Sequence, residues 1–489
     1  MLRCTGALAS SALALGGLAL GATPASASHL TPGPCLTVTT NTTLTSDVGP
    51  CNGHGIVVQA DNITLNLNGH TVTGAKNEAE QAGVLLDGVS GVTVKNGEIT
   101  GFDAGVSIEG GSGNTVTGLN VHDNVNDMIE AIDPRSIVIA GAPNGMPTPA
   151  QREQISRITC DYGDGITTLD SSNNVIKGNR VVGNGPYAGI SLVGDSNGNK
   201  VSGNEVSEND LLNDGVTDGA GNPVFVGTAP GPTRGFHVPA GTPGAVAPQS
   251  MCGATEIGST GMGRGREVQS IGIRVEGPGA DQNVVDANRV TKSGLAGISL
   301  HSHVFNQTAV TRPPEPSNQH NVVSGNSVSL TGADTHTIDS FADGIASLSS
   351  GPVGTVTLPS DTNTIEKNRS FDNFRNGISL GRLTFANSVD KNVVTNNGGS
   401  GIWVAGPGGS SGDTRGAHDN SITKNKGSGN AEFDGTDLNP ACDNNLWSGN
   451  HFTTVSQPCV AGGSPGKVFK NVGGGSPGGS TAGLSHSAR

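Results

Sequence analysis

Arginine, glutamate and histidine alternate with apolar residues in two neighbouring phrases of the chain, and their types could support acid–base chemistry. Arg274 and Glu276 stand two residues apart in "GIRVEG", and His301 and His303 do the same in "GISLHSHV". Because side chains alternate between the two faces of a strand, each pair should project from one face. A cation, a carboxylate and two imidazoles could hold an anionic substrate and move a proton. Two alternatives stay open: the first pair could simply be an ion pair in solvent, and the histidines could be ordinary exposed residues.

The spacing of His301 and His303 is also compatible with a metal site. A metal ion needs a further ligand, and the candidates are His336 and Asp339 in "GADTHTIDSFADG". We assign no metal ligands on this basis. Ca²⁺ is kept as a candidate cofactor, because it could neutralise an acidic substrate.

Two short phrases recur along the chain and indicate a repeat architecture. The first, Asn-x-φ-x-x-Asn with φ apolar, begins at Asn174, Asn199, Asn283, Asn321, Asn363, Asn387, Asn420 and Asn445. The second, Gly-φ-x-φ or a near variant, begins at Gly105, Gly165, Gly189, Gly272, Gly297, Gly344, Gly377 and Gly401. Where nothing intervenes, as from Asn174 to Asn199, the period is 25 residues, which accommodates three short strands and three turns.

This period predicts a chain that winds around itself in stacked coils. Short strands with an inward apolar column, separated by Asn and Gly at tight corners, should pair in parallel with the coils above and below. Stacked asparagines should form amide ladders. We therefore expect an all-β solenoid, a parallel β-helix. The leucine-rich horseshoe is the rival repeat, but its L-x-x-L-x-L signature is missing.

The apolar positions of Gly-φ-x-φ should face the core, so the glycine, the x residue and the residue two beyond x should face outward. This places Ser299 and Trp403 on the outward face, with Arg382 just past its own strand. We interpret Trp403 as a stacking surface for a saccharide in preference to a core residue. Asp164 and Asp343 precede glycines, and we interpret them as turn residues.

Long insertions leave one corner of the predicted coils. The connection from the glycine of the second phrase to the next repeat asparagine takes 9 or 10 residues at Gly189 and Gly377, but 24 at Gly297, 19 at Gly344 and 19 at Gly401. Insertions at one corner should form a wall beside one sheet and so a lateral groove. In the alternative interpretation the insertions have no function, because surface loops accept added residues at little cost in free energy.

Composition and the first residues indicate an exported protein. Only 3% of the 489 residues are aromatic, while 77 are glycine, which argues against a thick globular core. Residues 1–27 contain Arg3, an apolar run and a final Ala-Ser-Ala, the pattern of a cleaved secretory signal. The formal net charge of −14 disfavours nucleic acid and anionic membrane as partners. No later window has the length and apolarity of a transmembrane helix.

The cysteines also fit an oxidising compartment. Six remain after the signal, and pairing by proximity gives Cys35–Cys51 and Cys442–Cys459 as clips at the two ends. Elimination then leaves Cys160–Cys252. We expect structural disulfides, because the chain contains no C-x-x-C.

The predicted organisation follows from these features. We expect a signal peptide (1–27), a disulfide-clipped cap (28–55), the β-helix (56–461) and a disordered Gly/Ser-rich tail (462–489). The expected insertions are 126–157, 210–266, 301–320, 349–362 and 406–419.

The two alternating phrases, together with "CLTVTTNTTLTSDVGPCNGHG" at the start and "ACDNNLWSGNHFTTVSQPC" at the finish, resemble a known repeat. It is the right-handed parallel β-helix of secreted bacterial proteins, a broad group that includes NosD-like proteins, pectate-lyase-like enzymes and alginate C5-epimerases. The two ends resemble those of uncharacterised actinobacterial members. The similarity covers most of Cys35 to Cys459. It implies a right-handed, single-stranded solenoid with long loops on one flank, but no single activity.

From these features we expect a secreted, monomeric, carbohydrate-active protein that binds an acidic extracellular polysaccharide in a lateral groove. In the preferred mechanism, that of a polysaccharide lyase or C5-epimerase, Arg274 or Arg382 clamps a uronate carboxylate and His301 acts as base. Glu276 joins this catalytic set, and Ser299, His303 and Trp403 join Arg382 in binding substrate. A glycoside hydrolase would need paired carboxylates. The alternative function is a non-catalytic carbohydrate-binding or structural module.

Overall fold

The computed structural model describes residues 33–75, 81–124, 164–185, 188–208, 271–277, 279–294, 296–302, 318–332, 342–349, 360–407 and 416–462, and the backbone of three short strands. These three strands are β17 (Phe225–Val226), β18 (His237–Val238) and β40 (Val468–Phe469). The predicted signal peptide, most of the insertions at 126–157 and 210–266, and most of the tail therefore lie outside the described residues. His303, His336, Asp339, Cys160 and Cys252 lie outside them as well.

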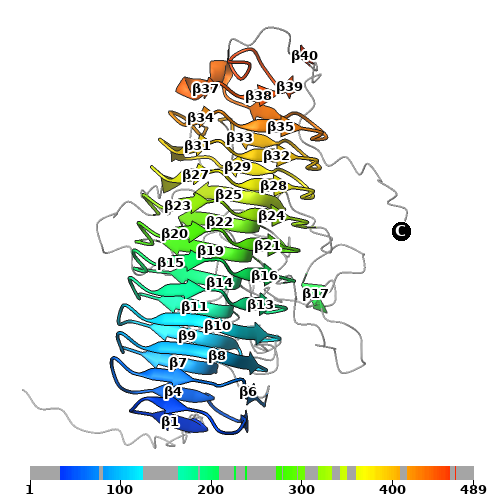
Figure 1. Cartoon of the computed structure of the whole chain (residues 1–489). Coiled ribbons are helices and arrows are strands. Elements are labelled where there is room, and N and C mark those ends of the chain that lie inside the picture. The colour runs from blue at the N-terminus through cyan, green and yellow to red at the C-terminus, as the bar shows by residue number, and fades with distance from the viewer. Residues whose placement is uncertain are drawn as a thin grey trace, which may run out of the picture. The chain divides into compact units, whose positions relative to one another are not determined.

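One parallel sheet, called sheet A here, runs through every coil of the described part (Figure 1). Its strands, in spatial order, are β1 (Leu36–Val38), β4 (Ile56–Val58), β7 (Ala82–Asp87), β9 (Ala104–Glu109), β11 (Asp164–Leu169), β14 (Ala188–Val193), β19 (Ile271–Gly277), β22 (Ala296–Ser302), β25 (Asp343–Ser349), β29 (Ile378–Leu380), β33 (Ile402–Val404), β36 (Gly435–Asp437), β39 (Thr454–Val455) and β40. Spatial order follows chain order, so each coil lies directly on the previous one.

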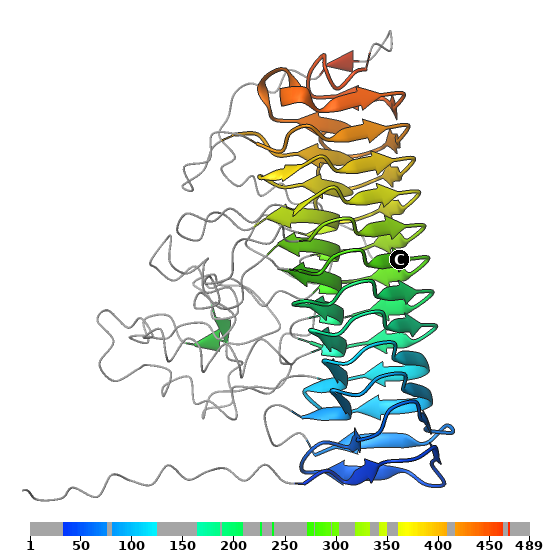
Figure 2. The same ribbon diagram turned by 90° about the vertical axis from the view of Figure 1, so that its left-hand side faces the viewer.

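Two further parallel ladders complete the coils (Figure 2). The first contains β2 (Thr42–Thr43), β5 (Thr64–Asn66), β8 (Thr93–Thr100), β10 (Thr115–His122), β12 (Val175–Lys177), β15 (Lys200–Ser202), β20 (Val284–Asp286), β23 (Val322–Ser324), β27 (Thr364–Glu366), β31 (Ser388–Asp390), β34 (Ser421–Thr423) and β37 (Leu446–Ser448). The second contains β3 (Val48–Cys51), β6 (Thr71–Gly74), the later halves of β8 and β10, β13 (Arg180–Val182), β16 (Glu205–Ser207), β21 (Arg289–Thr291), β24 (Ser327–Ser329), β28 (Arg369–Phe371), β32 (Val393–Thr395), β35 (Lys426–Ser428) and β38 (His451–Phe452). The pair β26 (Ser360–Asp361) and β30 (Thr384–Phe385) and one 3-10 helix, η3 (Pro440–Asn444), lie at corners. The prediction of three strands per coil is confirmed.

The core consists of apolar columns inside the coils. The first φ residue of Gly-φ-x-φ is an isoleucine that is fully buried and in register from strand to strand: Ile166, Ile190, Ile273, Ile298, Ile345, Ile378 and Ile402. Branched side chains pack well on a pleated surface, and these isoleucines belong to one hydrophobic core cluster. A narrow core of this kind needs few aromatic residues, which explains the composition.

The asparagines that bound the repeat phrase form the predicted amide ladders. The Asn392 Nδ2 group donates to the Ile365 carbonyl at 2.8 Å and to Asn425 Oδ1 at 3.0 Å, while Asn392 Oδ1 accepts from the Asn368 backbone N–H at 2.9 Å. The same pattern links the coils from Asn179 to Asn450. These amides satisfy buried backbone groups at the corners, where the strand ladders end.

Disulfides close both ends as predicted. Cys35 is bonded to Cys51, and Cys442 is bonded to Cys459. The proposed bond between Cys160 and Cys252 lies outside the described residues.

The prediction that the glycine of Gly-φ-x-φ faces outward is wrong. A Cβ added to Gly165 would point into the coil, 2.5 Å from the Val181 side chain and 2.5 Å from the Gly189 carbonyl. Gly165 and Ile166 therefore both face the interior. As a result, the residue before the glycine, Asp164, takes an outward position.

Candidate functional site

The structure brings together four of the predicted site residues on the outward face of sheet A. Strands β19 and β22 are adjacent, and their register pairs Arg274 with Ser299 and Glu276 with His301. The regular coil places the same repeat positions side by side, so the sequence alternation was sufficient to predict this neighbourhood. We call these four residues the β19–β22 cluster.

The sequence predicts exposed side chains at the four positions of the β19–β22 cluster. The structure shows that all four residues are buried. Arg274 is 2% exposed, Glu276 and Ser299 are 0% exposed, and His301 is 7% exposed. The alternation of side chains along a strand fixes which face a residue takes. It does not show what covers that face.

Burial makes the charges within the cluster interdependent. The Arg274 guanidinium forms an ion pair with the Glu276 carboxylate, and His301 Nδ1 lies 3.9 Å from Glu276 Oε1. The open alternative of an Arg274–Glu276 ion pair is thus correct, although it is not in solvent. A buried charge needs a partner, because removal from water costs several kcal/mol per ion. Ser299 adds a buried hydroxyl with no hydrogen bond in the structure.

Asp164 is a second buried acid on the same face, and its interpretation as a turn residue was wrong. It begins β11 and is 1% exposed, and its Oδ2 accepts a hydrogen bond from the Ser191 hydroxyl at 2.7 Å. Burial raises the pKa of Asp164 to about 7, against the opposing effects of the Ser191 hydrogen bond and the positive charge of Arg274. Asp164 therefore gains and loses its proton near neutral pH.

Asp343 occupies the corresponding position at the start of β25. It is 1% exposed and accepts a hydrogen bond from the Asn376 backbone N–H at 2.9 Å. Burial raises the pKa of Asp343 also, while the charge of Arg375 opposes the shift. The sequence contained one signal for these two buried acids. An aspartate stands directly before the glycine, at a position where neighbouring coils have Ala188 and Ala296.

The other predicted binding residues lie on later coils. Trp403 is partly exposed on β33, in register with Ser379 on β29, and the Arg375 guanidinium lies over its ring at 5.3 Å. Arg382 is exposed just after β29. Two strands of sheet A, β25 and β29, separate Trp403 from the β19–β22 cluster.

The described residues offer no metal centre. None of their His, Cys, Asp and Glu side chains form a group of three that could hold a metal ion. His303, His336 and Asp339, the possible partners of His301 in such a site, lie outside the described residues. The described part also has no helix with the length and apolarity needed to cross a membrane.

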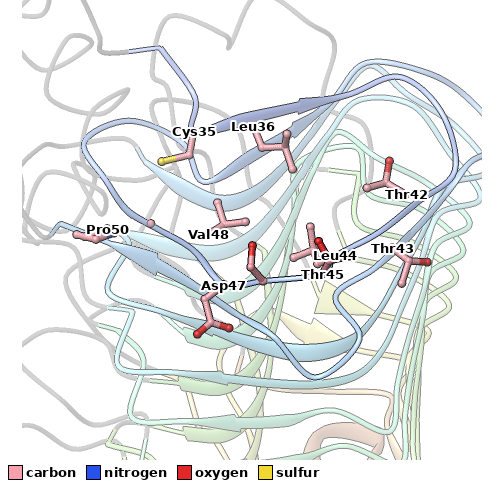
Figure 3. A pocket seen from close by; sticks show the side chains of 11 residues that line it. Cys35, Leu36, Thr42, Thr43, Leu44, Thr45, Asp47, Val48 and Pro50 are labelled. Atoms are coloured by element: carbon pink, nitrogen blue, oxygen red, sulfur yellow. The ribbon is translucent and has the colours of Figure 1, made fainter.

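A separate cavity of about 500 Å³ lies at the first coil (Figure 3). Leu36, Leu44 and a run of threonines line it, and Asp47 supplies its ionisable group. Hydrogen bonds from the Thr71 backbone N–H and from His70 lower the pKa of Asp47. The Asp47 carboxylate is already engaged by the Thr71 backbone N–H at 3.0 Å and by His70 Nδ1 at 3.1 Å, so the β19–β22 cluster remains the candidate site.

Comparisons with known proteins agree with the architecture. The sequence model for the right-handed β-helix region matches residues 35–216. No curated protein matches the chain.

Solved structures with similar folds are distant in sequence. The Dettilon tailspike protein is 14% identical with a TM-score of 0.40, and the match covers 90% of this chain and 59% of that one. This chain thus spans about three fifths of the tailspike. The periplasmic alginate epimerase AlgG is 13% identical (TM-score 0.46; 83% and 71% covered). The A-module of the Azotobacter vinelandii mannuronan C-5 epimerase AlgE6 is 10% identical (TM-score 0.40; 87% and 85% covered). The stacked parallel ladders and the matched sequence region identify the fold as a right-handed parallel β-helix.

Proposed function

We propose that this protein acts on an acidic polysaccharide at the outward face of sheet A, as a lyase or C5-epimerase. The observation that carries the proposal is the contact of three ionisable groups on two adjacent strands: Arg274 paired with Glu276, and Glu276 beside His301. A cation, a carboxylate and an imidazole in one buried cluster are the groups that removal of a proton beside a carboxylate requires.

Each residue has a defined role in this proposal. Arg274 shares its positive charge between Glu276 and the carboxylate of the bound uronate, which makes the proton on the adjacent carbon, C5, more acidic. His301 takes this proton, and Glu276 orients the imidazole and stabilises its charged form. In a lyase the bond from C4 to the leaving oxygen then breaks, a C4–C5 double bond forms, and the leaving oxygen takes up a proton from solvent. In an epimerase a proton from solvent is added to the opposite face of C5.

Ca²⁺ has no step in this proposal, because no three His, Cys, Asp or Glu residues of the described part form a group that could hold it. The positive charge comes from Arg274.

The burial of the cluster favours a second candidate function, a non-catalytic carbohydrate-binding or structural module. Residues that are at most 7% exposed could serve mainly to hold the outward face together. The two candidates differ in whether the covalent structure of a bound polymer changes.

An extracytoplasmic location forms part of the proposal. The disulfides Cys35–Cys51 and Cys442–Cys459 support it, because such bonds persist mainly in oxidising compartments.

The test is incubation of the purified protein with pectins, alginates and glycosaminoglycans in D₂O. A lyase produces ultraviolet absorbance from the new double bond, and an epimerase introduces deuterium at C5, which NMR detects. We expect one of these signals with at least one polymer. Binding without either signal would refute the catalytic proposal and establish the binding module.

A further inference from the structure

Three lysines stack on consecutive coils, away from sheet A, at the corner that joins the ladder of β27, β31 and β34 to the ladder of β28, β32 and β35. Lys367, Lys391 and Lys424 directly follow β27, β31 and β34, strands that lie one above another in Figure 1. The Lys367 backbone N–H donates to the Asp390 carbonyl at 3.0 Å, and the Lys391 N–H donates to the Thr423 carbonyl at 3.0 Å. The coil geometry therefore aligns the three side chains.

The backbone at this corner is unfavourable for lysine. Lys367, Lys391 and Lys424 have φ values of 56°, 56° and 55°, in the left-handed region that residues with a Cβ rarely adopt. Other coils have small residues or asparagine at the same corner: Asn96, Gly118, Gly178, Gly203, Ala287, Gly325 and Gly449. Folding alone would favour glycine in all three coils. Three lysines in succession at this corner therefore place positive charges where the backbone conformation alone favours glycine.

These lysines belong to a larger positive surface. Arg369 and Lys426, two residues after Lys367 and Lys424, are also exposed. The side chains of Lys367 and Lys391 are 58% and 50% exposed. We call these five residues the basic strip.

Two acids reduce the charge of the basic strip without cancelling it. The Lys367 Nζ group lies 2.7 Å from Glu366, and Lys391 pairs with Asp390. Five basic side chains thus stand beside two acidic ones, in a chain whose net charge is −14. A local excess of positive charge on a negative protein attracts anions mainly within about one Debye length, roughly 8–10 Å.

We propose that the basic strip is a binding site for a linear acidic polysaccharide that runs along the stacking direction of the coils. Parallel strands are about 4.8 Å apart, so the three lysines present one positive charge per coil at that interval. Sugars that each carry one carboxylate or sulfate can match such a series. Duplex DNA carries one negative charge per roughly 1.7 Å of its axis, which does not match one lysine per coil. The polymer class rests on the proposed function, but the site is separate from the β19–β22 cluster and is tested separately.

The test compares the full-length protein with the triple variant Lys367→Gly, Lys391→Gly, Lys424→Gly. Affinity for alginate and for polygalacturonate is measured by calorimetry at low and at physiological salt. We expect a loss of at least tenfold in affinity and a weaker dependence on salt in the variant. The melting temperature should stay the same or rise, because glycine relieves the left-handed backbone.

Lys292→Gly is the matched control. Lys292 is an exposed lysine with a φ of 55° that pairs with Glu208, at a different corner. We expect it to bind as the wild type does. Equal affinity of the triple variant and the wild type would overturn the proposal. So would a lower melting temperature of the triple variant, since that would assign the lysines to the fold, or binding of duplex DNA in place of the polysaccharides.

Failure of this proposal is distinguishable from failure of the proposed function. If only the basic strip is wrong, the triple variant keeps wild-type affinity while the polymer is still converted. If only the catalytic proposal is wrong, the wild type binds the polymer through the strip and leaves it unchanged.

Discussion

Arg274 and Glu276 form an ion pair within one strand, with both side chains buried on the outward face of sheet A. In most coils this face has small or uncharged residues at the same positions, such as Ser191 and Ser299 beside Arg274. A buried ion pair can be replaced by apolar residues without loss of stability in many proteins. Stability alone therefore does not account for this pair, which the proposed function uses to hold a uronate carboxylate.

Removal of either partner of this pair should destabilise the protein strongly. We expect Glu276→Gln or Arg274→Met to lower the free energy of unfolding by about 3–5 kcal/mol, because each breaks a buried ion pair by removing one of its two charges. The double variant should recover most of this loss. Urea denaturation of the three variants measures the effect, and additive losses in the double variant would contradict the pairing.

Asp164 predicts a specific pH dependence of stability. Because its pKa is raised from 3.8 to about 7, the folded protein retains the proton where the unfolded chain has lost it. The contribution of Asp164 to the free energy of unfolding is complete below pH 4. It falls as the pH rises towards 7, by about 4 kcal/mol in total at roughly 1.4 kcal/mol per pKa unit.

Asp164→Asn mimics the neutral acid and should remove this loss. The stability of the variant relative to the wild type should therefore increase between pH 4 and pH 7, as denaturation at a series of pH values would show. Asp87→Asn, at the exposed end of β7, is the control. Parallel profiles for the wild type and Asp164→Asn would refute the raised pKa.

Alanine and aspartate in place of a ladder asparagine should destabilise the protein to different degrees. Asn392→Ala leaves buried donors and acceptors unsatisfied, each at a cost of about 1–3 kcal/mol. Asn392→Asp should be worse at neutral pH, since it directs a carboxylate at two acceptors, the Ile365 carbonyl and Asn425 Oδ1. Thermal denaturation of both variants tests this order, and an equally stable aspartate variant would show that the amide donors contribute little.

The inward-facing glycine of sheet A should not tolerate a methyl group. In Gly165→Ala the new Cβ would lie 2.5 Å from Val181 and from the Gly189 carbonyl, which should cost about 2–3 kcal/mol. Gly203→Ala is the comparison: its φ is +64° but its Cβ would meet nothing within 4 Å, so we expect a cost of about 1 kcal/mol. The reverse order in chemical denaturation would contradict the inward orientation of Gly165.

The fold could be predicted from the sequence because the coil repeats its local rules. Asparagine spacing, apolar alternation and corner glycines specify the same geometry in each coil. A coil with a weak signal can therefore be assigned from its neighbours. The neighbourhood of Arg274, Glu276, Ser299 and His301 followed directly from that register.

Side-chain environment could not be predicted in the same way. Gly165 and Ile166 both face the interior, which leaves Asp164 on the outward face beside Ser191, and simple alternation along the strand does not reveal this arrangement. The burial of Arg274 depends on groups beyond its own strand and its register. The left-handed conformation of Lys367 is set by the corner of the coil, not by the lysine itself. The glycines at the same position of other repeats were the sequence signal for it.

The most direct test of catalysis at the β19–β22 cluster compares two variants, His301→Ala and His122→Ala. The measured quantity is the rate at which each converts an acidic polysaccharide. His122 also contacts carboxylates, with Nε2 3.1 Å from Glu98 and Nδ1 2.7 Å from Asp123, but it lies on β10, outside sheet A. We predict that His301→Ala loses turnover by at least about 100-fold while His122→Ala keeps the wild-type rate. Equal rates for the two variants and the wild type would show that the β19–β22 cluster is not the site of catalysis.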